Sequence, residues 1–206
     1  MKRPVNSNYD RRRGTSTLIF PDNEPKPIEY YVRGGICWPI PLPQEDNEIV
    51  GFALIAGVNV ETDEIMIFEE REFACVDNIM GEDHQIEFEG VAPFFNMCWQ
   101  KYYCHKFFYN QRKEMHRKYM LETVRSDSIK PKPQFIRMHW DKNHDVEQIM
   151  YEKQTLNRLK CEQDGELHQQ IKTYTVVPGN PHPAMYALFC LLAGLQKFPW
   201  KEPHKE

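Results

Sequence analysis

The chain has 206 residues, of which 41% are hydrophobic and 13% aromatic, and its mean hydropathy is −0.67. The aromatic share excludes a generic disordered chain, because such chains are poor in aromatic residues. No apolar run approaches the roughly 18 residues that a membrane-spanning helix needs, so we expect no contact with a membrane.

The formal net charge of −4 hides a strong segregation of charge along the chain. Residues 1–17 carry a net +4, and residues 101–118 carry a net +5. Between them, residues 44–92 hold fourteen Asp and Glu against Arg71 alone. Segregated charge creates local fields that attract partners of opposite sign.

The six cysteines are spread along the chain without a C-x-x-C pair. The N-terminal residues contain charge but no apolar core of a secretory signal. Together these features predict reduced thiols in a cytoplasmic or otherwise intracellular protein.

The N-terminal half predicts a flexible arm followed by strands. Residues 1–16 are polar and basic without periodicity, which is typical of a flexible arm. The proline-rich residues 20–44 predict an extended segment with short strands near 28–32 and 35–38. Residues 49–58 and 65–73 are apolar runs separated by a polar stretch, which indicates an antiparallel hairpin. The alternation in 85–89 predicts one more half-buried strand.

A long helix is expected over about residues 93–124, because Pro93 suits a first helical turn and helical periodicity follows it. The expected core stripe of this helix is Met97, Cys104, Phe108, Met115 and Tyr119. Cations interleaved with aromatic residues cover the flank beside that stripe.

The C-terminal half predicts a strand over 135–140, a helix over 145–163 and a strongly apolar helix over 184–198. The fold class is therefore α+β, an antiparallel sheet with about three helices packed on it. We expect a single domain over residues 17–198, between the flexible basic arm 1–16 and a C-terminal tail 199–206.

The cationic segments predict contact with nucleic acid. Lys and Arg neutralise phosphates, and aromatic faces stack on exposed bases of single strands or RNA. The expected contact residues are Arg11, Arg12, Arg13, Lys101, Tyr102, His105, Lys106, Tyr109, Arg112, Lys113, His116 and Arg117. The same cations could instead pair with the acids of this chain or with an acidic protein surface, so DNA, RNA and protein partners all stay open.

Catalytic chemistry has weaker support in the sequence. His139, Asp141 and His144 crowd a strand-to-helix junction, which makes a metal-dependent nuclease the alternative function. The simpler explanation is a helix that begins near Asn143 with acids in its first turn. We therefore expect no metal, no cofactor and no catalytic residue.

The absence of any complete catalytic motif favours a non-catalytic subunit of a larger assembly over an enzyme. A purely structural, oligomer-forming protein is a further alternative, because Tyr, Trp, Phe and Met are enriched at subunit interfaces.

Overall fold

The computed structural model describes residues 4, 6–21, 26–41, 49–75, 91–110, 120–121, 123–139, 143–174 and 182–201. Its named elements are β1 (Asn6–Asp10), β2 (Thr15–Ile19), β3 (Pro27–Pro41), β4 (Ile49–Asn59), β5 (Ile65–Cys75), α1 (Val91–Tyr102), β6 (Lys106–Tyr109), β7 (Gln134–Arg137), α3 (Asn143–Thr155), β8 (Leu159–Lys160), α4 (Glu166–Thr173) and α5 (Pro183–Lys197). This arrangement confirms the predicted α+β class. Among the described residues, none of the helices is long and apolar enough to cross a membrane.

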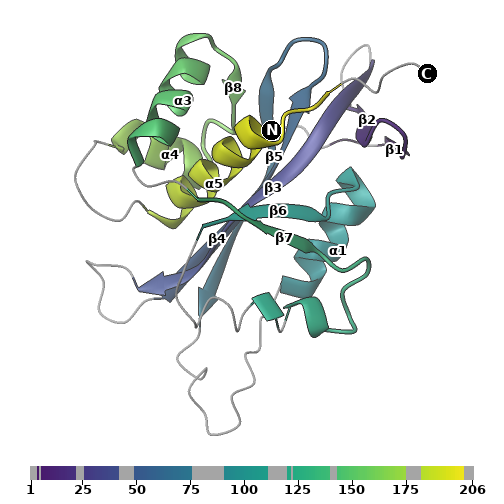
Figure 1. Ribbon diagram of the computed structural model, residues 1–206, viewed down its shortest axis with the longest axis horizontal. Helices are drawn as coiled ribbons and strands as arrows, with labels where there is room; N and C mark the ends of the chain where they lie inside the picture. Colours follow the sequence, from purple (N-terminus) through teal and green to yellow (C-terminus); the bar gives the residue numbers. More distant parts are fainter. Residues whose placement is uncertain are drawn as a thin grey trace, which may run out of the picture.

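Most neighbouring strands of the 8-stranded sheet are antiparallel (Figure 1). Strands β1 to β5 follow one another in chain order, and β4 and β5 form the expected hairpin. The short strand β6 runs parallel to β3 and to β7, and β8 runs parallel to β5. Because β2 pairs with the first part of β3 and β6 with its middle, both lie along the same edge of β3.

The two faces of the sheet are covered by different helices, because successive side chains of a strand point to opposite faces. On one face, Leu54 and Ala56 of β4 share a buried cluster with α5, α3 and α4. On the other face, Ala53 and Ile55 share a second buried cluster with α1. In Figure 1, α3, α4 and α5 accordingly lie on one side of the strands and α1 on the other.

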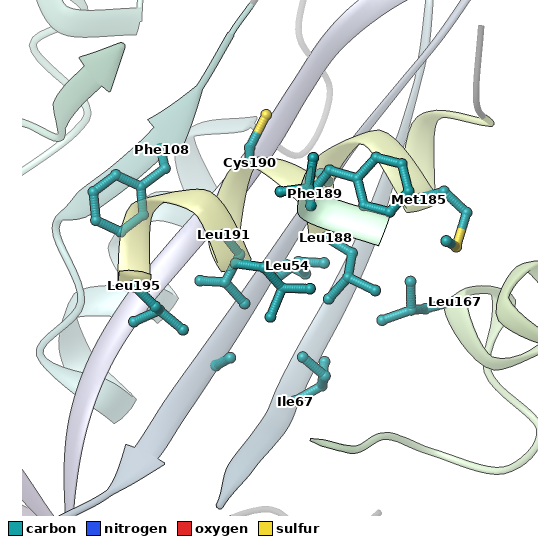
Figure 2. Close-up of a cluster of buried hydrophobic side chains, with 14 of the residues drawn as sticks. Leu54, Ile67, Phe108, Leu167, Met185, Leu188, Phe189, Cys190, Leu191 and Leu195 are labelled. Carbon is teal, nitrogen blue, oxygen red and sulfur yellow. The ribbon is translucent and has the colours of Figure 1, made fainter. Parts of the chain in front are cut away.

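Helix α5 confirms the predicted apolar helix and lies across the first of these faces. Leu188 and Leu191 point toward Leu54 in the close-up of this cluster (Figure 2). A helix that is apolar around most of its circumference is stable only when it is buried on several sides. Gly194 permits a close contact with β6, since a Cβ atom at this position would lie 2.2 Å from the Phe108 ring.

The expected helix over 93–124 is wrong over residues 103–110. Tyr103 adopts a left-handed conformation with φ 52°, and its N–H donates to the Trp99 carbonyl at 2.9 Å. The chain then turns into β6, so the segment KFFY is a strand. Residues 111–119 lie outside the described residues, and helical structure resumes at residues 120–121 and 123–125.

The expected helix over 145–163 also ends early, at Thr155. Asn157 is left-handed with φ 55°. Its N–H donates to the Gln154 carbonyl at 2.8 Å, and that of Arg158 donates to the Lys153 carbonyl at 2.7 Å. This pair of bonds is a Schellman motif, which satisfies the last carbonyls of the helix and stops it. Beyond it, β8 lies within the range of the expected helix, and α4 lies in a stretch for which the sequence analysis predicted no element.

The N-terminal segment forms strands where the sequence analysis expected a flexible arm over residues 1–16. Residues 6–10 and 15–19 form the β1–β2 hairpin, which pairs with β3 at the edge of the sheet. The Asp10 carboxylate accepts the N–H groups of Arg12 and Arg13 and so closes the turn. Leu18 is fully buried, which anchors the hairpin. The expected strand over 85–89 lies outside the described residues, and the division into one domain with a tail stays a prediction.

Candidate nucleic-acid interface

Four rings from three segments form a half-buried group, here called the aromatic surface cluster: Tyr9, Trp99, Tyr103 and His105. Tyr9 of β1 stacks on Tyr103 with ring centroids 5.5 Å apart. Trp99 of α1 meets the Tyr103 and His105 rings edge-on, each at 5.4 Å.

The end of α1 brings these rings together. The left-handed Tyr103 reverses the chain, so that its ring and that of His105 return toward Trp99 on the last turns of the helix. Strand β1 lies against α1 and adds the Tyr9 ring from the edge of the sheet. Rings held apart from the main core in this way retain surface that a base could contact.

Cations lie close in the chain to two members of the aromatic surface cluster, Tyr9 and His105. Arg11 and Arg12 are exposed in the turn that follows β1. Lys106 directly follows His105, and Arg33 of β3 lies close enough to influence both groups. Burial and Arg33 lower the pKa of Lys106, while burial, Lys106 and Arg33 lower the pKa of His105. Within the described part of the chain, no carboxylate forms an ion pair with Lys106 or Arg33, which leaves a local excess of positive charge.

Tyr102, which the sequence analysis placed in the interface, belongs to the core. Its side chain is 0% exposed, its hydroxyl donates to Glu69 at 2.8 Å, and its ring stacks on Phe68 with centroids 5.3 Å apart. An enclosed ring is not available to a base. Tyr109 is half-buried and packs against the same cluster of side chains.

Two predicted cations are paired within the chain. Arg13 lies 2.7 Å from Glu29, and its guanidinium lies over the Trp200 ring at 5.4 Å. Lys101 lies 3.7 Å from Glu69. These contacts are the internal charge pairing that the sequence analysis kept as an alternative, and they make both residues weaker candidates for phosphate contact. The remaining predicted cations, Arg112, Lys113, His116 and Arg117, lie outside the described residues.

The expected contact residues did not include four members of this surface: Tyr9, Trp99, Tyr103 and Arg33. Tyr9 lies two residues before the three consecutive arginines, which was a usable signal. Arg33 carried no comparable signal, because its position beside Lys106 depends on the parallel pairing of β3 with β6.

The residues of the proposed nuclease site are only partly described. His139 is exposed, whereas Asp141 and the side chain of His144 lie outside the described residues. Among the residues that the structure describes, no group of three or more His, Cys, Asp and Glu is placed to hold a metal ion.

A separate group of titratable side chains surrounds the start of α4. The Glu70 carboxylate accepts the Leu167 N–H at 3.1 Å, and Cys161 Sγ lies 3.5 Å from His168 Nδ1. Burial and the charge of Glu70 raise the pKa of Cys161 to about 11. Because the thiolate is the nucleophilic form of cysteine, this environment disfavours a catalytic role for Cys161.

Comparison of the chain with models of known protein families, with curated proteins and with solved structures gives no match. The function is therefore argued from the residues of this chain.

Proposed function

We propose that the protein is a non-catalytic subunit of a larger assembly that contacts single-stranded nucleic acid through the aromatic surface cluster and the cations beside it. The observation that carries this proposal is the convergence of rings from β1, α1 and the segment after α1, next to exposed Arg11 and Arg12 and to Lys106.

Each component has a distinct physical role in such a contact. Arginine and lysine side chains release counterions from phosphates, which supplies affinity that is independent of sequence and weakens with salt. Aromatic rings stack on unpaired bases, and each stacked base contributes about 1–3 kcal/mol. A duplex hides its base faces, so this combination favours single strands.

Fluorescence anisotropy with labelled single-stranded RNA, single-stranded DNA and duplex DNA tests the proposal. We expect tighter binding to the single strands and an affinity that falls as salt rises. Tyr9→Leu keeps an apolar side chain at the edge strand but removes the ring, so we expect about a tenfold loss of single-strand affinity.

The charged part of the interface is tested by Arg11→Glu with Arg12→Glu. We expect weaker binding and a shallower dependence on salt, because two phosphate contacts are lost. The matched control is Lys130→Glu with Lys172→Glu, which makes the same change in net charge at exposed positions elsewhere. Equal effects of the two pairs would contradict a defined interface.

The acidic-protein alternative gives a different result in the same assay. Binding to poly-glutamate that depends on Arg11 and Arg12 but not on the Tyr9 ring, with no binding to oligonucleotides, would replace nucleic acid by an acidic protein surface as the partner.

A further inference from the structure

Arg33 and Lys106 are neighbours on the sheet face that α5 covers. Strands β3 and β6 pair in parallel with Gly35 opposite Phe108, so Arg33 and Lys106, two residues earlier on each strand, lie opposite each other. Adjacent strands are about 4.7–4.9 Å apart, and side chains two residues apart on one strand share a face. Phe108 belongs to the buried cluster that contains α5, so both cations point to that face.

Neither cation forms an ion pair in the part of the chain that the structure describes. The Arg33 guanidinium lies 3.7 Å from the centre of the Tyr31 ring and donates to the Val32 carbonyl at 2.6 Å, which fixes its position. Lys106 is half-buried, and burial and Arg33 both lower its pKa. The pair therefore lacks the negative charge that would offset its mutual repulsion.

An exposed aromatic ring lies beside the two cations. Tyr31, two residues before Arg33, donates its hydroxyl to the Phe198 carbonyl at 3.2 Å. Phe108, two residues after Lys106, stacks on the Phe198 ring with centroids 6.0 Å apart. Phe198 is thus held by both strands next to the cation pair, yet it is 41% exposed. A ring beside two cations can contact a base and its phosphate together.

The charge of the pair favours a terminal phosphate over an internal one. A phosphate monoester carries about −1.5 to −2 charges at pH 7, because its second pKa is about 6. Each phosphodiester within a strand carries one negative charge. Arginine binds a phosphate through two parallel hydrogen bonds, and lysine binds it as a point charge. Two adjacent cations without a carboxylate therefore match a monoester better than a diester.

We propose that Arg33, Lys106 and Phe198 bind the phosphorylated end of a single nucleic-acid strand. The two cations contact the terminal phosphate, and the Phe198 ring stacks on the terminal base. This site rests on the proposed function and adds the feature of the strand that is recognised.

The site continues the proposed interface around one edge of β3. His105 contacts α1 on one face of the sheet, whereas Lys106, the next residue, points to the face of α5. Strand β2 pairs with β3 as far as Tyr30, and β6 pairs with it from Gly34 onward. The turn before β2, with its two exposed arginines, therefore lies at this edge between the aromatic surface cluster and the terminal site.

Fluorescence anisotropy with three single-stranded RNAs of one sequence, each labelled on an internal base, tests the site. One RNA carries a 5′-phosphate, one carries a 3′-phosphate, and one has hydroxyl groups at both ends. We expect the wild type to bind one of the phosphorylated strands about tenfold more tightly than the hydroxyl strand. The preferred strand identifies the end that occupies the site.

Variants of the site should change this preference. Arg33→Gln and Lys106→Gln should each bring the ratio of the two affinities close to one, and Phe198→Leu, which removes the ring, should weaken the preferred strand. Arg12→Gln is the matched control, because it removes an exposed cation of the interface outside this site. It should weaken all three strands and leave the ratio unchanged. Because the strands titrate the same protein sample, any loss of folded protein cancels from the ratio.

The outcomes separate the terminal site from the proposed function. Binding of all three strands with equal affinity would reject the terminal site alone, whereas no binding of any strand would reject both. A preference that survives Arg33→Gln and Lys106→Gln, or that Arg12→Gln reduces equally, would also overturn the terminal site, because it would then reflect general charge attraction or another position.

Discussion

Tyr102 shows how one hydroxyl ties α1 to the acidic strand β5. The Tyr102 hydroxyl donates to Glu69, and the Lys101 ammonium lies 3.7 Å from the same carboxylate, which is 7% exposed. A buried carboxylate is tolerated only when donors compensate for its lost hydration. The side chain that the sequence placed on a binding surface therefore makes a buried structural contact.

Replacing Tyr102 with Phe should lower the free energy of unfolding by about 1–3 kcal/mol, since a buried charged acceptor loses a donor while the stacked ring remains. Urea denaturation measures the change. Tyr151→Phe is the control, because Tyr151 is 43% exposed and should change stability little. Similar losses in both variants would contradict a special role for the Tyr102 hydroxyl.

Glu70 connects two elements, because its carboxylate on β5 accepts a backbone N–H from the first turn of α4. Gly165, at the start of α4, provides no side-chain cap of its own. Burial raises the pKa of Glu70 above 4.5, the Leu167 N–H opposes this shift, and Glu162 and Glu166 add to it. The cap thus comes from a neighbouring strand and carries a charge that its surroundings disfavour.

A raised pKa means that folded Glu70 holds its proton more tightly than in the unfolded chain. Its contribution to stability is therefore complete below about pH 4.5 and is lost as the pH rises through the folded pKa. Glu70→Gln keeps an acceptor for the Leu167 N–H without the charge. We expect the variant to be more stable than the wild type at pH 7, by a margin that shrinks toward pH 4, in urea denaturation at several pH values. A margin that does not change with pH would contradict the raised pKa.

The end of α3 depends on Asn157, whose left-handed backbone completes the Schellman motif. Asn157→Ala should cost about 1 kcal/mol more than Asn157→Gly, because alanine pays a steric penalty at positive φ and glycine does not. Both variants remove the side-chain oxygen that accepts from Lys160, so their difference isolates the backbone. Thermal and urea denaturation measure this difference, and equal stabilities would show that α3 ends by other means.

The sequence pattern predicted those strands and helices that are marked by an apolar run of their own. The β4–β5 hairpin and α5 are examples, because β4, the first four residues of β5 and most of α5 are apolar runs. The two helix ends escaped prediction because Tyr103 and Asn157 adopt left-handed conformations without the glycine that normally signals them.

The error at α1 then changed the candidate interface. The expected core stripe included Cys104 and Phe108, which lie beyond the end of the helix. The residues that α1 buries are Phe94, Phe95, Cys98 and Tyr102, at true helical spacing. Cys104 and Phe108, which lie beyond the end of α1, fixed which face of the expected helix was taken as buried. Tyr102 was therefore assigned to the exposed flank. The assignment of Arg11 and Arg12 needed no helix phase, and both are exposed. Lys106 was assigned to the cationic flank of the expected helix, and it is partly exposed in β6 instead.

At the scale of the whole molecule, β3 and β4 belong to both buried clusters, one on each face of the sheet. If the helices left one face of the sheet, apolar side chains of β3 and β4 would be exposed there. The same two strands also support the buried cluster on the other face. The expectation of a single domain therefore predicts that the sheet and the helices on both faces unfold as one cooperative unit.

Leu188→Ala in α5 tests this cooperativity, because it removes a fully buried side chain from one cluster only. We expect a loss of about 2–5 kcal/mol in the free energy of unfolding. In native-state hydrogen exchange read by peptide mass spectrometry, protection should fall together in α5, in β3 and β4, and in α1 on the opposite face. Leu156→Ala, at an exposed position, should leave the protection pattern unchanged. A loss of protection confined to α3, α4 and α5 would instead divide the molecule into two units that unfold separately across one sheet.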